Sequence, residues 1–233
     1  MTNLLLGGLK GLRLALVLGL TGHLAVPTAA VSSKMDYLPL ASVRTDPVIN
    51  PTCLSDHVHT YYGVNASLRP STAYADLRAA AGNSGAVEEN KSLYWHPSVY
   101  KFSPATGLYT LAEISFATAY YVWESATTAP TTAFPNGFKM LAYGSDPKAR
   151  VVATCDGQAA CEREDGCATT NSFFPQDACA ELEVKLIFPT CWDGVRIDSP
   201  DHIAHVSYDE SEEGQFDGNC PATHPVKIPE IHL

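Results

Sequence analysis

Apolar and polar side chains alternate most regularly in residues 181–188. Leu182, Val184, Leu186 and Phe188 occupy every second position there, so an extended backbone places all four on one face. A helix, with a period of about 3.6 residues, would scatter them around its axis. The pattern therefore predicts a β-strand over this segment.

Shorter runs of apolar, aromatic and β-branched residues recur along the rest of the chain, separated by glycine, proline and asparagine. Such runs are typical of strands joined by turns. The further predicted strands are residues 110–123, 137–143, 150–154, 203–208 and 226–231. This rhythm favours an all-β fold, or a β-rich α+β fold, built as an antiparallel sandwich or a jelly-roll-like domain.

One segment has the features of a helix. Residues 72–81 can begin at Ser71 or Thr72 as N-cap, and Gly82 follows as a stop signal. Two other segments are loops: residues 125–136 are rich in Thr, Pro and Ala, and residues 209–219 are acidic. Strand-like segments flank both loops and need partners to bury their apolar faces. We therefore predict a single domain over residues 31–233.

The first thirty residues differ in composition from the rest. They contain no acidic residue, two basic residues (Lys10 and Arg13), an apolar run at residues 14–20 and small residues at positions 28–30. These are the parts of a secretory signal peptide, residues 1–30, cleaved at its end. The alternative is an uncleaved membrane anchor, since the apolar stretch approaches bilayer length if the two basic side chains reach the interface. We expect a secreted protein, extracellular or in the cell wall.

Charge excludes two classes of partner. The net charge of the chain is −10, and loss of Lys10 and Arg13 with the leader changes it to −12. Nucleic acids and anionic membrane surfaces select clustered Lys and Arg, and the sequence has no basic run. No segment after the leader is apolar enough for a transmembrane span. The sequence gives no indication of the oligomeric state.

All seven cysteines lie after residue 30: Cys53, Cys155, Cys161, Cys167, Cys179, Cys191 and Cys220. An exported chain meets oxidising conditions, so we expect two or three disulfides to staple the domain. The spacing of Cys155, Cys161 and Cys167 is wider than in zinc knuckles, which disfavours a cysteine metal site. Glycosylation sequons at Asn65 and Asn90 agree with secretion.

Four of the eight histidines fall in two short segments. His57 and His59 are two positions apart, so a strand would place both imidazoles on one face, close enough to hold one metal ion. The alternative is a pair of partly exposed histidines hydrogen-bonded near a turn. His202 and His205 form the second pair, near three aspartates.

The conformation of the second segment decides what it can bind. Ser199-Pro200 can open a helical turn, which would place Asp201, His202 and His205 on neighbouring faces. In an extended segment His202 and His205 would point to opposite sides, and only one of them could join a site. Together with the upstream pair, the helical arrangement would give four imidazoles suited to a transition metal such as zinc or copper.

A metal-free site is the other interpretation of this segment. Asp193, Asp198 and Asp201 are candidate catalytic residues, because one carboxyl group can act as general acid while another acts as base. Paired carboxylates are also the arrangement found in glycosidases. The alternative is that these aspartates only shape turns, since Asp-Gly and Asp-Ser-Pro are typical turn sequences.

Flat aromatic side chains accompany the polar segments. Trp95, His96 and Trp192 are candidate substrate-binding residues, because aromatic faces with polar edges can stack on sugar rings, and packing in the core is the alternative. The sequence has no glycine-rich phosphate loop, no nucleophile elbow and no His-Glu-x-x-His motif. The ordinary nucleotide-binding and hydrolase assignments are therefore excluded.

Seven segments resemble one known protein family and occur in the order of that family. They are Asp46–Val48, Ser55–Thr60 with Gly63, Ser92–Tyr100, Phe134–Met140, Phe188–Gly194, Asp198–Val206 and Cys220–Val226. Each is weak alone, but together they are specific and cover nearly all of the chain after the leader. On these segments the chain resembles the fungal secreted domain of unknown function 1996 family, DUF1996.

The resemblance implies a secreted fungal protein with the histidine segments as its signature. Some family members are joined to small domains thought to bind cell-wall carbohydrate, which implies a polysaccharide-related role. Members usually continue beyond the Thr-His-Pro-Val element, so we expect this chain to lack the usual C-terminal region and, with it, part of the site. Cys53, Cys161 and Cys167 lie where family cysteines are not expected, so the disulfide pattern is expected to be its own.

Three functional hypotheses follow from the sequence. The first is a secreted protein that binds or acts on cell-wall or other extracellular polysaccharide, with the histidines and aspartates around a metal or a sugar. The second is a non-catalytic cell-wall or effector-like binding protein in which the same residues only brace the fold. The third is an enzyme that acts on a small molecule.

Overall fold

The structure is a computed structural model, and it describes residues 32–123, 130–142, 151–156, 158–162, 180–210 and 218–233. The predicted leader, residues 1–30, lies outside these ranges, as do Cys167 and Cys179. Within the described ranges no helix has the length and apolar character needed to cross a membrane.

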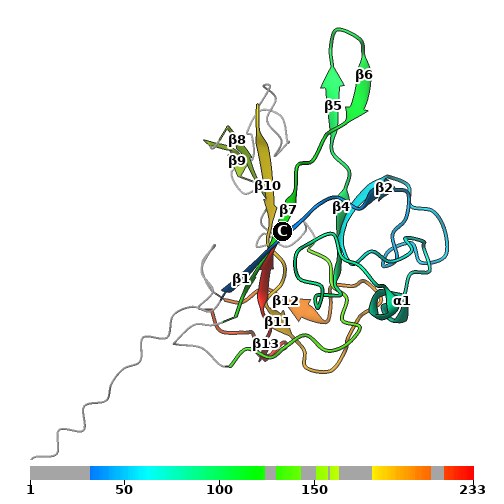
Figure 1. The fold of residues 1–233 in the computed structure, drawn as a ribbon. Coiled ribbons are helices and arrows are strands. Elements are labelled where there is room, and N and C mark those ends of the chain that lie inside the picture. Colours follow the sequence, from blue (N-terminus) through cyan, green and yellow to red (C-terminus); the bar gives the residue numbers. More distant parts are fainter. Residues whose placement is uncertain (1–31, 124–129, 143–150, 157, 163–179, 211–217) are drawn as a thin grey trace, which may run out of the picture.

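Three segments far apart in the sequence form the central sheet. Strand β7 (Ala117–Val122) lies in the middle and pairs antiparallel with β1 (Ser32–Tyr37) and with β14 (Glu230–His232). Figure 1 shows this arrangement as blue, green and red strands that cross the middle of the molecule. The sheet therefore ties both ends of the described chain to its centre.

A second sheet carries the first histidine segment. Its order is β2 (Ala41–Val43), β3 (His59–Gly63) and β4 (Leu93–Pro97), and both pairings are antiparallel. All five residues of the central strand β3 are buried. The strand ends at Gly63, whose φ is +99° and where an added Cβ would lie 2.3 Å from the Ser92 carbonyl oxygen, so only glycine fits.

Two further three-stranded sheets contain most of the later strands, with the orders β10–β8–β9 and β12–β11–β13 and antiparallel pairing throughout. Their strands are β8 (Val151–Cys155), β9 (Gln158–Glu162), β10 (Leu182–Leu186), β11 (Cys191–Trp192), β12 (Val206–Ser207) and β13 (Val226–Lys227). The predicted β-rich antiparallel class is confirmed, and the strands are divided among several small sheets.

A two-stranded hairpin projects from this body. Strands β5 (Tyr100–Ser103) and β6 (Leu108–Leu111) pair only with each other. Gly107 follows the turn with a φ of +67°, and its N–H donates to the Ser103 carbonyl, as a hairpin loop of this length requires. Figure 1 shows the hairpin at the top of the molecule, beyond the other sheets.

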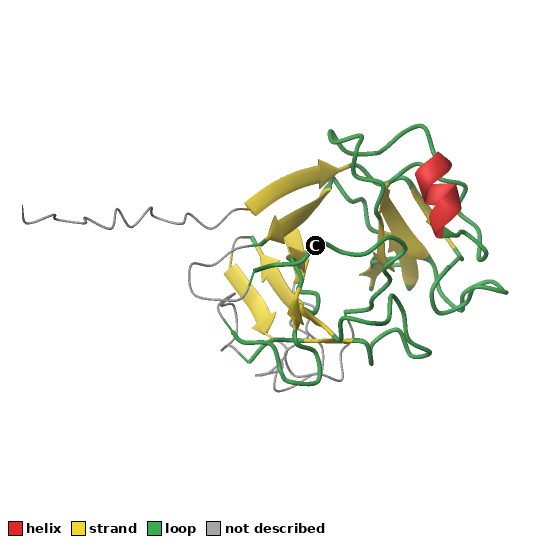
Figure 2. Ribbon diagram, turned by 90° about the horizontal axis from the view of Figure 1, so that it is seen from below, coloured by secondary structure: helices red, strands yellow, loops and turns green. Residues whose placement is uncertain are grey.

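The described helix is short and peripheral. Helix α1 spans Tyr74–Ala79, and Figure 2 shows it at the edge of the molecule. Its N-cap is Ala73, not the predicted Ser71 or Thr72. The Thr72 hydroxyl is instead engaged with backbone carbonyls of the preceding turn, and the Asp76 carboxylate accepts the Ala73 N–H at 2.9 Å. The predicted helix is confirmed, although it ends before Gly82.

Tyrosines dominate the hydrophobic core, whose buried cluster consists of Tyr37, Tyr62, Tyr94 and Ala119. The Asn90 side chain donates to the hydroxyls of Tyr37 at 3.0 Å and Tyr94 at 3.2 Å. Burial raises the pKa of Tyr94 to about 12, so these hydroxyls stay protonated as donors and acceptors. Of the two sequon asparagines, Asn90 is therefore committed to the core, whereas Asn65 is exposed.

A disulfide joins the last sheet to the segment that follows the acidic loop. Cys191 of β11 is bonded to Cys220, with a Cα–Cα distance of 5.6 Å. Closing a loop of this length stabilises a fold by about 3 to 4 kcal/mol in the chain-entropy account. Cys155 is also disulfide-bonded, and Cys53 is exposed and free. The expected disulfide stapling is thus confirmed at Cys191 and Cys220.

Four of the predicted strands need correction. The segment 110–123 divides between β6 and β7, the segment 226–231 divides between β13 and β14, and within 203–208 the strand is confined to β12. Residues 137–142 form no strand. The latter segment is an extended loop whose backbone pairs with the second histidine segment: Lys139 N–H donates to Ile197 and Leu141 N–H to His202. Its aromatic and apolar residues gave it strand-like composition, but its partners are turns.

Candidate functional site

The first histidine segment reaches the interior at His59. This residue opens the buried strand β3, and its Nδ1–H donates to the Thr45 carbonyl at 2.8 Å. Its Nε2 lies 3.7 Å from a carboxylate oxygen of Asp46. Burial lowers the pKa of His59, although the Thr45 hydrogen bond and the Asp46 charge oppose that effect. His59 is thus a neutral, backbone-anchored core residue near pH 7.

His57 occupies a different environment. It precedes β3 and is exposed, so the two histidines do not lie in one strand as predicted. Their rings still meet, with centroids 4.5 Å apart and planes at 57°. Asp46 beside them shapes a turn, since its Oδ1 accepts the N–H groups of Val48 and Ile49, each at 2.9 Å.

The neighbouring strand β4 brings Trp95 and His96 next to this pair. Trp95 stacks on Tyr61, with centroids 5.6 Å apart. His96 accepts the Tyr62 hydroxyl at Nε2 (2.9 Å), and its Nδ1 donates to the Pro97 carbonyl (2.7 Å). Burial lowers the pKa of His96. Both rings pack against tyrosines of β3, and their predicted role in substrate binding stays a prediction.

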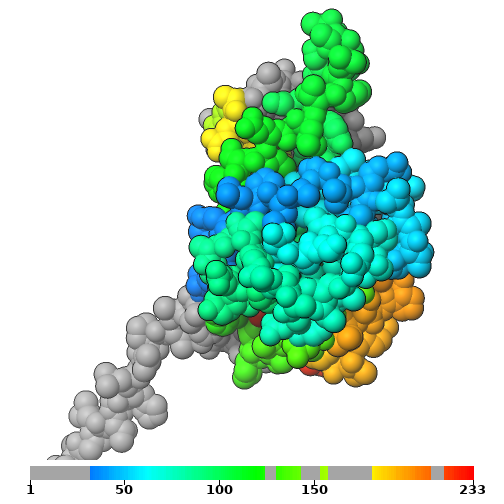
Figure 3. Space-filling view, turned by 45° about the vertical axis from the view of Figure 1, so that its right-hand side comes forward, coloured from blue at the N-terminus to red at the C-terminus, as the bar shows by residue number. Residues whose placement is uncertain are grey.

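The second histidine segment is a series of turns that begins after β11 (Figure 3, orange). Asp193 starts the first turn: its Oδ1 accepts the N–H groups of Val195 and Arg196, and its Oδ2 receives Nε of Arg196 at 2.6 Å. Burial alone would raise the pKa of Asp193, but these hydrogen bonds and the guanidinium lower it to about 2. Asp193 therefore stays ionised and holds a turn.

Asp201 holds the next turn in the same way. Its Oδ1 accepts the N–H groups of Ala204 (2.9 Å) and Ile203 (3.1 Å) and the hydroxyl of Ser199 (2.7 Å). The Ala204 N–H, the Ser199 hydroxyl and the Ile203 N–H together lower the pKa of Asp201 strongly. A carboxylate with three such donors on one oxygen is a poor general acid near neutral pH.

His205 is the buried anchor of this segment. Its ring is fully buried, its Nε2–H donates to the Lys139 carbonyl at 2.6 Å, and its Nδ1 lies 2.9 Å from the Ser199 hydroxyl. The Phe138 ring meets it edge to face at 5.3 Å. Burial lowers the pKa of His205, so it is neutral near pH 7. Nε2 is bonded to the Lys139 carbonyl, and Nδ1 shares with Asp201 the single proton of the Ser199 hydroxyl.

His202 differs from the other three histidines. Its Nδ1 lies 2.6 Å from Oδ1 of Asp198, and the other carboxylate oxygen of Asp198 is 3.7 Å from Nζ of Lys139. Its side chain is 19% exposed, and Nε2 has no hydrogen-bond partner among the residues the structure covers. Its φ is +58°, in the left-handed region that a non-glycine residue rarely adopts.

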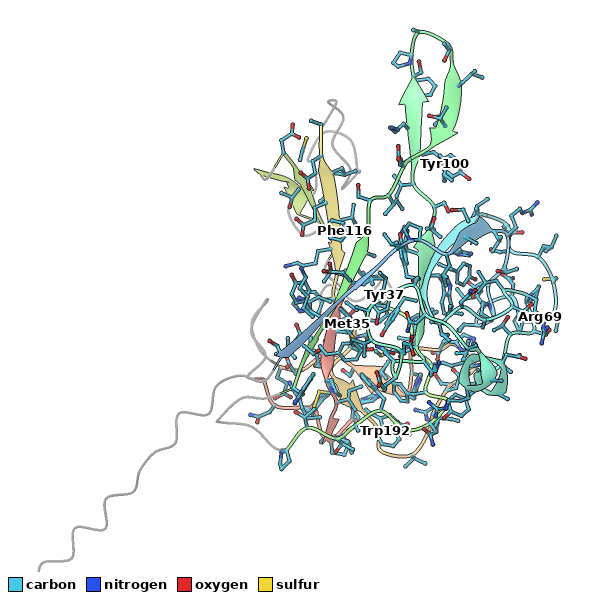
Figure 4. All side chains as sticks on the ribbon, in the orientation of Figure 1. Met35, Tyr37, Arg69, Tyr100, Phe116 and Trp192 are labelled. Carbon is cyan, nitrogen blue, oxygen red and sulfur yellow. A yellow bond between two sulfur atoms is a disulfide. The ribbon has the colours of Figure 1, made fainter. Side chains whose placement is uncertain are left out.

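Trp192 forms one border of this group. Its Nε1–H donates to the Arg196 carbonyl at 2.6 Å, and its ring meets Phe138 edge to face at 6.0 Å. Gly137 lies between helix α1 and this segment, since a Cβ added at Gly137 would lie within 3.8 Å of both Tyr74 of α1 and Ile197. Helix α1 and the second histidine segment are therefore neighbours. Figure 4 shows Trp192 in the lower part of the molecule.

Comparison with known protein families matches residues 46–233 to the family described as Domain of unknown function (DUF1996). The chain belongs to the DUF1996 family. The match includes both histidine segments, and the resemblance seen in the sequence is confirmed. No curated protein and no solved structure matches this chain. The expected fungal origin and the expected short C-terminal region stay predictions.

In this DUF1996 protein the two histidine segments form two local networks. One contains Thr45, Asp46, His57, His59 and His96, and the other contains Lys139, Asp198, Ser199, His202 and His205. Within the described chain no hydrogen bond, ion pair or ring contact joins the two networks, and no three His, Cys, Asp or Glu side chains are grouped to hold a metal ion. The four-histidine zinc or copper site stays a prediction, and it would require His205 to give up an existing hydrogen bond.

Lys139 is the residue of this site that sequence reasoning missed. Its carbonyl accepts from His205 and its ammonium group lies near Asp198, so it contacts both halves of the second network. It stands in the Phe134–Met140 segment that carries the family resemblance, which was the available signal. Its role depends on a loop-to-loop contact across 66 residues, which the sequence alone does not show.

Proposed function

We propose that this protein binds or acts on an extracellular polysaccharide and that the Asp198–His202 pair is its proton-transferring centre. The single observation that carries the proposal is the 2.6 Å contact between Asp198 Oδ1 and His202 Nδ1, with Nε2 unpartnered among the described residues. The other histidines with anchored rings, His59, His96 and His205, use ring nitrogens to hold the fold.

The chemistry of this pair follows from its geometry. The Asp198 carboxylate accepts a proton-bearing Nδ1, so the neutral imidazole carries its lone pair on Nε2. A lone pair on a partly exposed nitrogen can accept a proton from a sugar hydroxyl or a water molecule, and the resulting imidazolium can return it to a leaving oxygen. The carboxylate stabilises that imidazolium. Asp198 and His202 can therefore serve one acid and base cycle.

The backbone at His202 supports a functional interpretation. A left-handed non-glycine residue costs roughly 1 kcal/mol or more, and such residues gather at functional sites. The turn is held from both sides, because His202 N–H donates to Ser199 and its carbonyl accepts from Leu141. The strained conformation is thus fixed by the surrounding loops, which keep the imidazole against Asp198.

Charge and aromatic surface favour a neutral polymer as the ligand. The chain has a net charge of −10, so it would repel acidic polymers. Trp192 and Arg196 flank the turns that carry His202, and a half-buried indole is a suitable platform for a sugar ring.

The experiment compares the purified protein with its His202→Asn variant on insoluble β-1,3-glucan, chitin and cellulose, with release of soluble sugar as the readout. Asparagine tolerates the left-handed conformation but cannot shuttle a proton, so we expect it to keep the fold and lose turnover about 100-fold or more. His57→Asn, in the other segment, is the matched control and should leave turnover unchanged. Full turnover in His202→Asn would exclude the proposed centre.

A non-catalytic binding protein is the second candidate. It is favoured by the number of predicted catalytic residues that hold turns or loops, namely Asp193 and Asp201. The same experiment separates the two: retention on a polysaccharide without any release of product, in wild type and variant alike, indicates binding only.

A further inference from the structure

The β5–β6 hairpin has two unlike faces. Cross-strand partners in an antiparallel pair lie on the same side of the ribbon. The pairs Tyr100–Leu111 and Phe102–Tyr109 therefore share one face, and Lys101–Thr110 and Ser103–Leu108 share the other. We call the first set the aromatic face: Tyr100, Phe102, Tyr109 and Leu111.

The aromatic face is open to solvent over its whole length. The exposed fractions are 45% for Tyr100, 52% for Phe102, 70% for Tyr109 and 46% for Leu111. Phe102 and Tyr109 touch each other, with centroids 4.8 Å apart, and form a continuous ring surface. No charged side chain lies on this face, since Lys101, the one charged residue between positions 100 and 111, points to the opposite side.

Such a surface is costly in water. A two-stranded hairpin without further strands is marginally stable, and neither β5 nor β6 pairs with a third strand in the described sheets. Contiguous exposed apolar surface on a soluble protein commonly marks a binding site. The aromatic side chains are therefore better explained by a ligand than by the fold.

A second copy of the chain is a poor occupant of this face. At roughly 200 Å² for a whole aromatic side chain, the exposed fractions leave about 300 to 400 Å² of ring surface. A stable protein interface buries about 800 Å² on each partner. Two copies also carry a charge of −10 each and repel one another. Area and charge both favour a smaller, uncharged ligand.

We propose that the aromatic face of the β5–β6 hairpin is a docking platform for a neutral polysaccharide chain. The apolar C–H faces of pyranose rings can stack on tyrosine and phenylalanine rings, and the Tyr100 and Tyr109 hydroxyls can bond to sugar hydroxyls at the edge. A linear chain of sugars matches the narrow, elongated form of a two-stranded ribbon. The absence of charge on the face suits a polymer that has none.

This inference rests on the proposed polysaccharide function and adds a second, separate contact with the polymer. Figures 1 and 4 show the hairpin at the top of the molecule and Trp192 near its bottom, so the aromatic face and the second histidine segment are far apart. The platform would hold an insoluble chain while chemistry at His202 is carried out elsewhere. Changes at one place should therefore leave the other intact.

The test is co-sedimentation of the full chain with insoluble β-1,3-glucan, chitin and cellulose, across a range of polysaccharide concentrations. We expect Phe102→Ala with Tyr109→Ala to weaken binding to the retained polysaccharide about tenfold or more, because both stacking rings are lost. Lys101→Ala with Leu108→Ala changes the opposite face of the same strands and should change binding less than about twofold. Tyr109→Phe keeps the ring and should retain most of the binding.

Several outcomes overturn the inference in distinguishable ways. Equal loss of binding in both double variants would mean that the hairpin as a whole, and not its aromatic face, is needed for binding. Circular dichroism and the melting temperature of each variant would show whether the loss comes from a folding defect. Undiminished binding in Phe102→Ala with Tyr109→Ala would remove the platform and leave the polysaccharide function in place. A wild-type protein that sediments with none of the three polymers would remove both. Dimerisation lost in the aromatic-face variant, measured by light scattering, would identify a second copy as the occupant.

Discussion

The two histidine segments are built alike but end differently. Each contains one buried histidine whose ring donates to a backbone carbonyl: His59 to Thr45 and His205 to Lys139. Each also contains a more exposed histidine, His57 or His202. The difference lies in this outer residue: among the described residues the His57 ring has a ring contact with His59 and no side-chain hydrogen bond, whereas His202 is held by a carboxylate.

This comparison separates structural from chemical histidines. A backbone carbonyl fixes the orientation of an imidazole ring, but it stabilises the positive charge of a protonated ring only through one hydrogen bond. A carboxylate fixes the ring and also stabilises its protonated form, which proton transfer requires. The sequence alone made all four histidines equal candidates. In the structure only His202 combines a carboxylate partner, partial exposure and an unpartnered nitrogen within the described residues.

The largest expected effect belongs to His205. Replacement by alanine removes a fully buried ring and leaves the Lys139 carbonyl without its partner, so we expect the free energy of unfolding to fall by about 3 to 4 kcal/mol. Denaturant unfolding of His205→Ala against wild type measures it. His57→Ala is the control and should change stability by less than about 0.5 kcal/mol. A loss of similar size in both variants would end the distinction between inner and outer histidines.

A smaller loss is expected at His59. The Thr45 carbonyl also accepts the Tyr61 hydroxyl at 2.7 Å, so it keeps one partner when the imidazole is removed. We expect His59→Ala to cost about 2 kcal/mol, less than His205→Ala. Adding Tyr61→Phe removes the second donor, and the double variant should lose about 1 kcal/mol more than the sum of the two single changes. Strict additivity would show that the shared carbonyl is not what limits the loss.

Stability should fall as the pH is lowered from 7 to 5. The pKa values of His59, His96 and His205 are lowered by burial, so in this range the unfolded chain binds protons that the folded chain does not. The unfolding free energy measured at pH 7, 6 and 5 should decrease steadily, and His205→Ala should flatten the decrease. Burial raises the pKa of Glu230, so the folded chain binds this proton more tightly than the unfolded chain and Glu230 opposes the trend. A stability that rises towards pH 5 would contradict the neutral, buried state of these rings.

The extent of sequence-based prediction differs between these regions for physical reasons. The strand predicted at residues 181–188 is confirmed as β10. Its apolar and polar residues alternate clearly because β10 lies at the edge of its sheet, where it pairs with β8. Strand β3 was missed, since all five of its residues are buried and its sequence shows no alternation. The hairpin face was missed as well, because Tyr100 and Phe102 fell in no predicted strand and exposure of aromatic residues cannot be read from their identity.

The site shows the same limit. The turn roles of Asp193 and Asp201 were open in the sequence as an alternative, and the structure gives both aspartates such hydrogen bonds. The four-residue spacing of Asp198 and His202 was visible, but the turn that brings them together has a positive φ at His202, which no sequence rule predicts for histidine. Local turn chemistry is therefore readable, whereas contacts that depend on strain or on a distant loop are not.

The smallest expected effect is on the free energy of unfolding of the His202→Asn variant, and the most specific expected result is the position of the proton on the His202 ring. His202→Asn should change the unfolding free energy by less than about 1 kcal/mol, since asparagine accepts the left-handed backbone and the lost hydrogen bond is partly exposed. In the wild-type protein, nitrogen NMR of labelled histidine should find His202 with its proton on Nδ1, because the Asp198 carboxylate accepts only at that atom. Asp198→Asn should weaken that preference and populate the Nε2–H form, while His57, which has no carboxylate at hydrogen-bond distance among the described residues, should be unaffected. If the His202 ring shows the same mixture of tautomers in wild type and in Asp198→Asn, the carboxylate does not control its proton. His202 would then be chemically equivalent to His57, and the proposed difference between the two segments would be wrong.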